Sequence, residues 1–357
     1  MTGASRTWRA PGRVNLIGGQ VDWHAGWVVA MAIDREVTIT RRPREDGRIM
    51  VRSSAFAEAV VVAADGRTEP ASVAPAWGRF VAAAVRELTA SGIPISGCDL
   101  DVASDLPVGA GLSSSAAFAV ACLQALAGAR SPSGNDLAFA AVRVEHAASG
   151  VPCGTQDPMA VVHGRTDHAL LVDCRSHAVA TLPWPEELTA LVVHSGVSRN
   201  LADTPFAEYR AESLSVAAAI GVPTLRDATL EQVADYPRGR HAVSEIDRVR
   251  AFAEALTAGD HDALGPLMDA SHASSRDDMG VSIPELDALT VILRNRGALG
   301  ARLTGAGFGG CVVALVRSES VDAVAHAACT DYRAATGREP RWWAVQAGSG
   351  AGPVDAP

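Results

Sequence analysis

Apolar and polar residues alternate in the first half of the chain in a pattern typical of β-strands. The segment 27–42, WVVAMAIDREVTITRR, is rich in β-branched residues and has a polar break at Asp34 and Arg35. The segment CDLDVASDLP, which ends at Pro107, alternates as a half-buried strand does. A loop of glycines and serines follows, and the apolar spacing beyond it predicts an Ala-rich helix over about 114–129.

The second half of the chain shows the same mixture of patterns. A Pro-Trp-Pro cluster at 183–185 separates two apolar segments, HALLVDC and LTALVVHSG, which we expect to be strands. Helices are expected after Ser244 and over 283–295, and Gly259 is placed to end the first of them. The apolar residues at helical spacing in that first helix are Ile246, Val249, Phe252, Ala253 and Leu256. A glycine-rich loop over 305–310 then leads into the strand segment CVVALV.

These elements predict an α+β fold, because strands and helices mix in both halves. A chain of 357 residues is long enough for two domains with good cores. We place the domains at 1–182 and 183–346, with the boundary at the Pro-Trp-Pro cluster. The tail 347–357, AGSGAGPVDAP, is of low complexity and is expected to be disordered.

Composition restricts the chemistry that these elements can carry. All 31 basic residues are arginines, which excludes a Schiff-base lysine, a lysine general base and the lysine of a Walker A loop. The net charge of −9 and the lack of a basic stripe argue against nucleic-acid and membrane partners. The first residues lack the apolar core of a secretory signal, and the six cysteines show no CxxC spacing. We therefore expect reduced thiols, no zinc site and a cytoplasmic protein.

The segment 107–118, PVGAGLSSSAAF, places a flexible loop between a strand and a helix. Its glycines allow backbone N–H groups to approach a ligand, and a helix N-terminus favours an anion such as the phosphates of a nucleotide. A plain capping loop with a serine N-cap is the alternative. The Rossmann fingerprint does not fit, because its third glycine would stand at Ser114. The glycine-rich stretch 304–311 precedes a strand and is a weaker indication of a ligand.

Three segments together resemble the GHMP small-molecule kinases, and in particular their galactokinase branch. Residues 107–116 are similar to the ATP-binding motif PxGxGLSSSA, and residues 302–311 (RLTGAGFGGC) to the C-terminal glycine motif. Residues 12–23 (GRVNLIGGQVDW) are similar to the signature GRVNLIGEHTDY. Further similar stretches follow in order along nearly the whole chain, namely CGTQDPM, HALLVDCRS, RHAVSEIDR and SHASSRDDMGVSIPELD.

The resemblance implies a two-domain GHMP kinase architecture, with ATP and a sugar bound in the cleft between the N- and C-terminal domains. It implies phosphorylation of the anomeric (C1) hydroxyl of an aldose by ATP, with Mg²⁺ as cofactor. Arg13 and Asp157 match the catalytic arginine and aspartate, and Ser115 and Glu145 match the Mg²⁺ ligands. The residues that match the ATP-binding motif are Pro107, Gly109, Gly111, Leu112, Ser113, Ser114 and Ser115. Those that match sugar-binding positions are Gly19, Gln20, Asp22, Gly154, Asp157 and Phe206.

The residues alone are compatible with this chemistry. Phosphoryl transfer needs alignment and charge stabilisation, which arginine, Mg²⁺ and backbone N–H groups supply in a chain without lysine. Asp157 can accept the proton of a sugar hydroxyl while Arg13 orients that hydroxyl. Without the resemblance, Asp157 before Pro158 is as readily a turn aspartate, Arg13 a surface ion-pair partner, and Glu145 an exposed helix residue.

The sequence departs from the signature where the sugar should bind. Glutamate and histidine of the signature are replaced by Gly19 and Gln20, whereas Asp22 is retained. A family tyrosine aligns with Phe206, although a register that uses Tyr209 instead is open. In the family, the two replaced positions face the C6 end of galactose, so the pocket loses polar partners there.

We therefore expect a modified or C6-extended aldose as substrate, such as a heptose, an octose or a sugar that already carries a phosphate, in a sugar-nucleotide or antibiotic-sugar pathway. The alternatives are an ordinary galactokinase and, in another class, a catalytically silent regulator that binds sugar and ATP. A dehydrogenase that uses the glycine loops for a dinucleotide is a more distant alternative. We expect a monomer or a weak homodimer.

Overall fold

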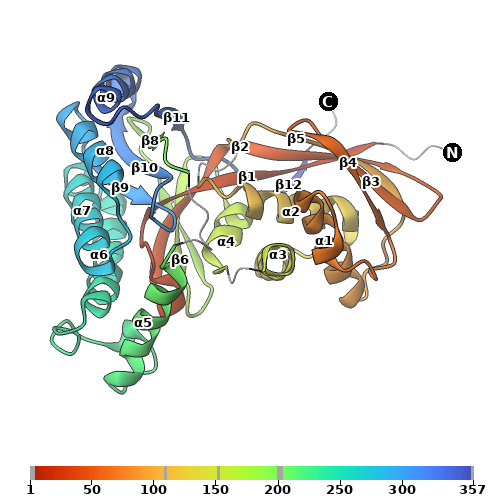
Figure 1. Cartoon of the computed structure of the whole chain (residues 1–357), viewed down its shortest axis with the longest axis horizontal. Helices are drawn as coiled ribbons and strands as arrows, with labels where there is room; N and C mark the ends of the chain where they lie inside the picture. Colours follow the sequence, from red (N-terminus) through yellow and green to blue (C-terminus); the bar gives the residue numbers. More distant parts are fainter. Residues whose placement is uncertain (1–4, 108–110, 151–152, 199–203, 355–357) are drawn as a thin grey trace.

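The structure, a computed structural model, describes residues 5–107, 111–150, 153–198 and 204–354. Within them, two β-sheets and the helices that cover them form two adjoining parts of one elongated molecule (Figure 1). The first part contains α1 (Arg79–Ala90), α2 (Ser114–Ala127), α3 (Gly134–Ser149) and α4 (Gln156–His163). The second contains α5 (Phe206–Ala219), α6 (Pro237–Ala258), α7 (His261–Ser274), α8 (Pro284–Asn295) and α9 (Val321–Thr336). No helix in the described part is long and apolar enough to cross a membrane.

The larger sheet has the strand order β12-β1-β2-β5-β3-β4 in the described residues, and β6 and β7 extend it from the other end of β2. Its strands are β1 (Arg6–Ile17), β2 (Trp27–Pro43), β3 (Arg48–Ser53), β4 (Phe56–Ala63), β5 (Cys98–Ser104), β6 (His168–Asp173), β7 (Val179–Pro183) and β12 (Gly352–Val354). β2 continues through the polar break at Asp34 and Arg35, since one end of β2 pairs with β6 and the other with β5. Helices α1 to α4 pack on one face (Figure 1).

The smaller sheet has the order β11-β8-β10-β9 and is antiparallel throughout. Its strands are β8 (Leu188–His194), β9 (Gly300–Thr304), β10 (Cys311–Arg317) and β11 (Arg341–Val345). Every residue of β8 is buried, as expected for a strand covered on both faces. The chain passes from the larger sheet to the smaller one between Pro183 and Leu188, within the Pro-Trp-Pro region.

The helix and strand predictions agree with these bounds in most places. The Ala-rich helix is α2, the helix that ends at Gly259 is α6, and the helix over 283–295 is α8. Gly259 adopts φ 74° as the C-cap of α6, the left-handed conformation that ends many helices. α6 begins at Pro237, earlier than the apolar pattern indicates, because its first two turns are packed through His241 and Ala242.

The prediction of a disordered tail over 347–357 is wrong for the residues that the structure describes. Strand β12 pairs antiparallel with β1, in the register Thr7↔Val354. The preceding residues bond to the larger sheet and α4, for example through Gly350 N–H to Gly164 O at 2.7 Å. Glycines predicted disorder, but here Gly350 is needed because a Cβ would lie 2.4 Å from Val162 O. Residues 355–357 lie outside the described part.

Candidate active site

A pocket of about 250 Å³ lies where the two parts of the molecule meet. The end of β1, the loop after it, and helices α2, α3 and α4 form one side, while α5 and the loop after β9 form the other. The described residues that line it are Arg13, Asn15, Gly19, Gln20, Asp22, Trp23, Ser115, Glu145, Cys153, Gly154, Gln156, Asp157, Phe206, Arg210, Gly305 and Ala306. The pocket therefore combines most of the site residues that the sequence predicts.

Arg13 and Asp157 form a bidentate ion pair in this pocket. Arg13 Nε donates to Asp157 Oδ1 at 2.7 Å, and Arg13 Nη2 donates to Oδ2 at 2.5 Å. Arg13 is fixed by the pairing of β1 with β2, and Asp157 lies in the first turn of α4, where the helix dipole favours a carboxylate. The arginine side chain is 7% exposed and the aspartate 32%, so the carboxylate is the member of the pair that a ligand can reach.

The glycine-serine loop is held by the same arginine. Gly111 O accepts a hydrogen bond from Arg13 Nη1 at 2.7 Å, and Leu112 O accepts one from the Arg13 backbone N–H at 3.1 Å. Ser113 precedes α2 with φ 56°, and its hydroxyl donates to Asp157 Oδ2. Because no side chain caps α2, the structure does not show the plain capping loop of the alternative interpretation.

The other residues of the predicted ATP loop lie at different distances from the pocket. Ser115 lines it from the first turn of α2, whereas Pro107 and Ser114 are half-buried and do not. Leu112 is buried in the main apolar core. Gly109 lies outside the described residues.

Asp22 and Gly154 meet at one wall of the pocket. Asp22 begins a 3-10 turn, and burial raises the pKa of its carboxyl, with the Asp157 carboxylate raising it further. A Cβ on Gly154 would lie 1.8 Å from Asp22 Oδ2, so only glycine allows this approach. Phe206 lines the pocket from α5, whereas Tyr209 packs on Phe308 with ring centroids 5.9 Å apart.

Gln20 adopts φ 57°, a conformation rare for residues other than glycine. Its Nε2 donates to Gly305 O at 2.9 Å, which ties the loop after β1 to the loop after β9. The glycine-rich stretch 304–311 therefore serves the site by close backbone approach. Gly307 has φ 84°, and a Cβ there would lie 2.2 Å from Val281 O.

Comparison with known proteins identifies the family. The sequence matches the profiles "GHMP kinases N terminal domain" over 79–165, "GHMP kinases C terminal" over 252–334 and "Galactokinase galactose-binding signature" over 2–43. The chain is 39% identical to the galactokinase of Roseiflexus sp. (strain RS-1), over 97% of this chain and 92% of that protein. It is 38% identical to the galactokinase of Chloroflexus aurantiacus, over 97% and 93% of the two chains.

The chain belongs to the GHMP kinase family. A solved structure of Lactococcus lactis galactokinase complexed with galactose has a TM-score of 0.90 and 28% identity, over 98% of this chain and 95% of that chain. Methanococcus jannaschii mevalonate kinase, with a TM-score of 0.72 and 20% identity, shares the fold. The chain is thus a phosphotransferase of the sugar kinase type with the two-domain GHMP kinase fold.

The residues beside Asp157 fit the Mg²⁺ that GHMP kinases use with ATP. Glu145 projects from α3 and is buried, and its Oε2 has no hydrogen-bond partner. Burial raises the pKa of Glu145 to about 7, although a hydrogen bond from Ser115 opposes this. A buried carboxylate with an oxygen free of hydrogen bonds, next to a hydroxyl, offers part of the oxygen set that Mg²⁺ prefers. Among the described residues no group of three His, Cys, Asp or Glu could hold a metal alone, so the remaining ligands would come from ATP and water.

Three residues of this kinase site were not predicted from the sequence. Arg210 lines the pocket from α5, with its guanidinium 5.3 Å from the Trp23 ring. Glu245 of α6 accepts the N–H groups of Gly18 and Gly19, and Arg302 of β9 lies behind Gly19. Glu245 and Arg302 lie in the family-like stretches RHAVSEIDR and RLTGAGFGGC. These stretches indicated the family but not that the two residues lie beside the pocket.

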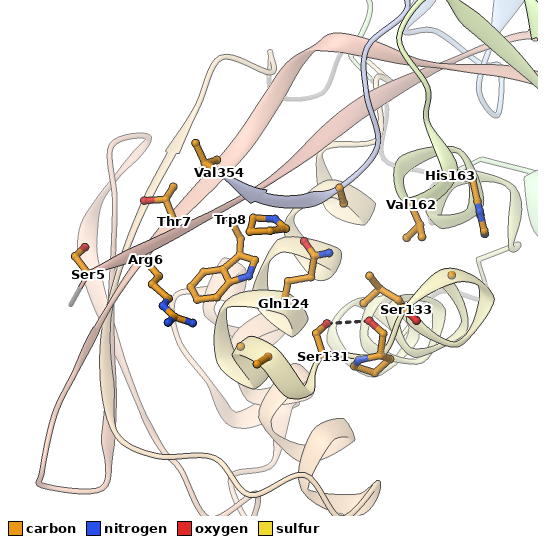
Figure 2. Close-up of a pocket in the computed structure, with 17 residues that line it drawn as sticks. Ser5, Arg6, Thr7, Trp8, Gln124, Ser131, Ser133, Val162, His163 and Val354 are labelled. Carbon is orange, nitrogen blue, oxygen red and sulfur yellow. Dashed lines mark hydrogen bonds between the residues drawn. The ribbon is translucent and has the colours of Figure 1, made fainter. Parts of the chain in front are cut away.

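A larger cavity of about 880 Å³ lies elsewhere in this kinase, between the start of β1, the end of α2, the start of α3 and β12. Figure 2 shows Trp8, Gln124 and the loop serines Ser131 and Ser133 around it. None of the described residues that line it is an aspartate or glutamate. It therefore lacks the carboxylates that phosphoryl transfer with Mg²⁺ requires, and the smaller pocket is the candidate active site.

Proposed function

We propose that this chain transfers the γ-phosphoryl group of ATP to the anomeric hydroxyl of an aldose, with galactose as the reference substrate. The bidentate pair of Arg13 and Asp157 beside the first turn of α2 is the observation that carries the proposal. Galactose is supported by the relatives named galactokinase and by the retained Asp22 in the pocket. Five of the six cysteines are buried and no disulfide joins any of them, which fits a cytoplasmic enzyme.

In the proposed reaction, the oxygen on C1 of the sugar bonds to the γ-phosphorus of ATP while the bond from that phosphorus to the β,γ-bridging oxygen breaks. The C1 hydroxyl proton passes to Asp157 Oδ1 or Oδ2, and ADP leaves. Arg13 holds the carboxylate in place and offsets the negative charge that grows on the attacking oxygen. Protonation of Asp157 weakens its bond with Arg13, so the guanidinium is then available to the phosphoryl oxygens.

The phosphates of ATP are proposed to lie at the N-terminus of α2. The backbone N–H groups of the first turn have no side-chain cap there, so they are available to an anion. Ser115 and Glu145 would hold Mg²⁺, which when bound neutralises charge on the phosphate oxygens. Glu145 needs its charged form for this role, whereas Ser115 supplies a neutral oxygen.

A second candidate substrate is an aldose modified at the end of the pocket that Gly19 and Gln20 form. The loss of the signature glutamate and histidine leaves fewer polar side chains there, which favours a substrate other than plain galactose. A catalytically silent regulator is a weaker alternative. The residues that match the catalytic and Mg²⁺-binding positions are all present and line one pocket, namely Arg13, Asp157, Ser115 and Glu145.

The test is incubation of the purified protein with Mg²⁺, ATP and a panel of aldoses, with mass-spectrometric detection of sugar phosphate and ³¹P NMR to place the phosphate on C1. We expect an aldose 1-phosphate and an equal amount of ADP. Binding of sugar and ATP without turnover would instead support the regulator. Phosphate on any carbon other than C1 would contradict the proposed reaction.

A further inference from the structure

The position of Gly19 leaves one buried arginine facing the pocket wall. If Gly19 carried a Cβ, the only atoms within 4 Å of it beyond the adjacent chain would be Nη2 of Arg302, at 2.5 Å, and Cζ of Arg302, at 3.7 Å. Any larger residue at position 19 would therefore displace this guanidinium from its place behind the pocket wall. The signature has a glutamate there, so this chain lacks both a carboxylate and the side chain that would cover the arginine.

Arg302 is 1% exposed and its hydrogen bonds leave one nitrogen unused. Nε donates to Ser271 Oγ at 2.9 Å, and Nη1 has a long contact of 3.4 Å with Asn15 Oδ1. Nη2 is buried without a hydrogen-bond partner. A buried guanidinium nitrogen without an acceptor costs more than a paired one, so the position favours an acceptor from elsewhere.

The nearest carboxylate of the protein does not supply that acceptor. Glu245 Oε1 lies 3.8 Å from Arg302 Nη2, beyond hydrogen-bond distance. The same oxygen already accepts from Gly18 N–H at 2.9 Å, Gly19 N–H at 3.1 Å and Ser271 Oγ at 2.6 Å, while Oε2 accepts from Arg248 Nε. Its charge is therefore shared among several donors and only partly balances Arg302.

The backbone of Gly19 is fixed in this place. Besides the two bonds to Glu245, the Gly19 carbonyl accepts from His241 Nε2 at 3.0 Å. The pocket face of Gly19 and the side chain of Asn15, which Arg302 contacts, both line the substrate pocket. The guanidinium thus lies directly behind the wall that a sugar would touch.

We propose that the substrate is an aldose whose terminal carbon is a carboxylate, a hexuronic acid, and that Arg302 is the specificity-determining residue that recognises it. The inference rests on the proposed function, because it concerns the sugar that the same pocket phosphorylates at C1. The substrate carboxylate takes the place of the side chain missing at position 19 and accepts a hydrogen bond from Nη2 of Arg302. Nη2 itself has no partner to lose. Because the guanidinium is rigid, turning Nη2 toward the substrate also shifts Nη1, whose contact with Asn15 Oδ1 is already long at 3.4 Å.

A carboxylate fits this place better than a hydroxyl or a phosphate. A neutral hydroxyl would accept the hydrogen bond but leave the buried positive charge unbalanced. A phosphate dianion needs several donors, whereas the second polar side chain nearby, Gln20, already uses its Nε2 on Gly305 O. Two acidic residues of the pocket face an arginine, since Arg13 pairs with Asp157, and Arg210 offsets part of the rise that burial causes in the pKa of Asp22.

The first experiment compares substrates that differ only at the terminal carbon. Galactose, galacturonate and galactose 6-phosphate are each assayed with Mg²⁺ and ATP by ADP release, with product detection by mass spectrometry. We expect kcat/KM for galacturonate to exceed that for galactose by at least about tenfold, the discrimination typical of one charged hydrogen bond. A kcat/KM for galactose or its 6-phosphate equal to or above that for galacturonate would overturn the inference.

The second experiment introduces a carboxylate at position 19 of the protein by substitution. Gly19→Glu should pair with Arg302 and lower the ratio of kcat/KM for galacturonate to kcat/KM for galactose by at least about tenfold. Gly19→Gln is the matched control of the same size without charge. If Gly19→Gln lowers kcat/KM for galacturonate as much as Gly19→Glu does, the effect is steric. Arg302 then does not recognise the charge of the substrate. Arg302→Lys, which keeps the charge, is expected to retain part of the preference for the acid.

The two proposals fail in different ways. If no aldose of the set is phosphorylated while ATP and sugar bind, the proposed kinase function fails. If galactose is phosphorylated efficiently and galacturonate is not, the kinase function holds and the assignment of Arg302 is wrong.

Discussion

At the residue scale, the site depends on charges that are held in pairs rather than singly. Arg13 is nearly covered by protein and holds Asp157 by two hydrogen bonds, and Ser113 adds a third. The guanidinium keeps the carboxylate oriented without needing any lysine. A neutral amide at 157 would keep the shape but could not accept a proton.

Asp157→Asn is expected to lower kcat by about 10²–10⁴-fold, the usual contribution of a general base. The fold should also lose some stability, because the amide has one acceptor and one donor where Arg13 needs two acceptors, and it leaves the guanidinium charge unpaired. Steady-state kinetics and urea unfolding measure the two effects. Asp331→Asn, which removes the aspartate of a surface pair with Arg296, is the matched control and should keep full activity. A fully active Asp157→Asn enzyme would exclude the assigned base.

Glu145 should make the metal-free fold less stable as the pH rises. Burial raises its pKa in the folded protein to about 7, from the ordinary value of 4.5. A carboxyl with a raised folded pKa stabilises the fold most below pH 4.5, and this contribution is lost as the pH rises toward 7. Relative to Glu145→Gln, the wild type should lose about 2 kcal/mol of unfolding free energy between pH 5 and 7.5, and added Mg²⁺ should reduce the loss.

Urea unfolding at pH 5 and pH 7.5 measures this difference. Glu339→Gln is the control, because a hydrogen bond from Arg333 lowers the pKa of the exposed Glu339 carboxyl. Its effect on stability should be the same at both pH values. Equal pH slopes for the wild type and Glu145→Gln would show that Glu145 does not titrate in this range.

The sequence allowed Arg13, Asp157, Asp22 and Glu145 to be predicted as neighbours, because their motifs align with those of a known family. Their pairing could not be predicted, since it depends on α4 bringing Asp157 against β1. Arg302 could not be predicted at all. Its proposed role depends on the absence of a side chain at Gly19, and the two residues are far apart in the sequence.

At the element scale, α7 packs against β9 through glycines on both sides. A Cβ on Gly265 would lie 1.9 Å from Leu299 O, and one on Gly300 would lie 2.3 Å from Gly265 O. This close approach fixes β9, and with it Arg302 and the loop that follows. The residue pattern indicates α7 only weakly, because Gly265 and Pro266 lie inside it and both weaken a helix.

Gly265→Ala should therefore destabilise the protein. Alanine in a helix gains up to about 1 kcal/mol over glycine, but here backbone atoms would have to move, which typically costs about 1–3 kcal/mol in a packed interior. We expect a net loss of about 1 kcal/mol or more, measured as a lower urea midpoint at unchanged slope. Gly352→Ala is the control, because nothing lies within 4 Å of its Cβ position and its backbone conformation is ordinary. A Gly265→Ala protein as stable as this control would contradict the close packing.

At the scale of the whole molecule, the first and last described strands, β1 and β12, lie side by side in the same sheet. After β11 in the smaller sheet, the backbone returns along the larger one, with Asp34 N–H bonded to Gln346 O at 3.1 Å and Gly348 N–H to Ala32 O at 2.8 Å. β12 then covers the outer edge of β1 (Figure 1). The chain thus passes between the two parts twice, once after β7 and once after β11. The prediction of two consecutive domains did not include the second passage.

A chain that stops after Val345 should be markedly less stable than the full chain. It loses five backbone hydrogen bonds, besides β12 itself, and these are made by Gln346, Ala347, Gly348, Gly350 and Ala351. At about 1 kcal/mol for each bond, the melting temperature should fall by about 10 °C in a thermal unfolding scan. A chain that stops after Val354 keeps all of these contacts and should melt like the full chain. Equal melting of both truncated forms would show that the tail adds no stability.

The position of β12 also has a consequence for synthesis. A ribosome makes residues in chain order, and β12 follows every other described element, so β1 is made long before its edge partner. Until β12 leaves the ribosome, the outer edge of β1 presents free N–H and C=O groups, to which a strand of another chain can add. A chain cut short before β12 would therefore be prone to aggregate, even though the described residues that line the active site are present.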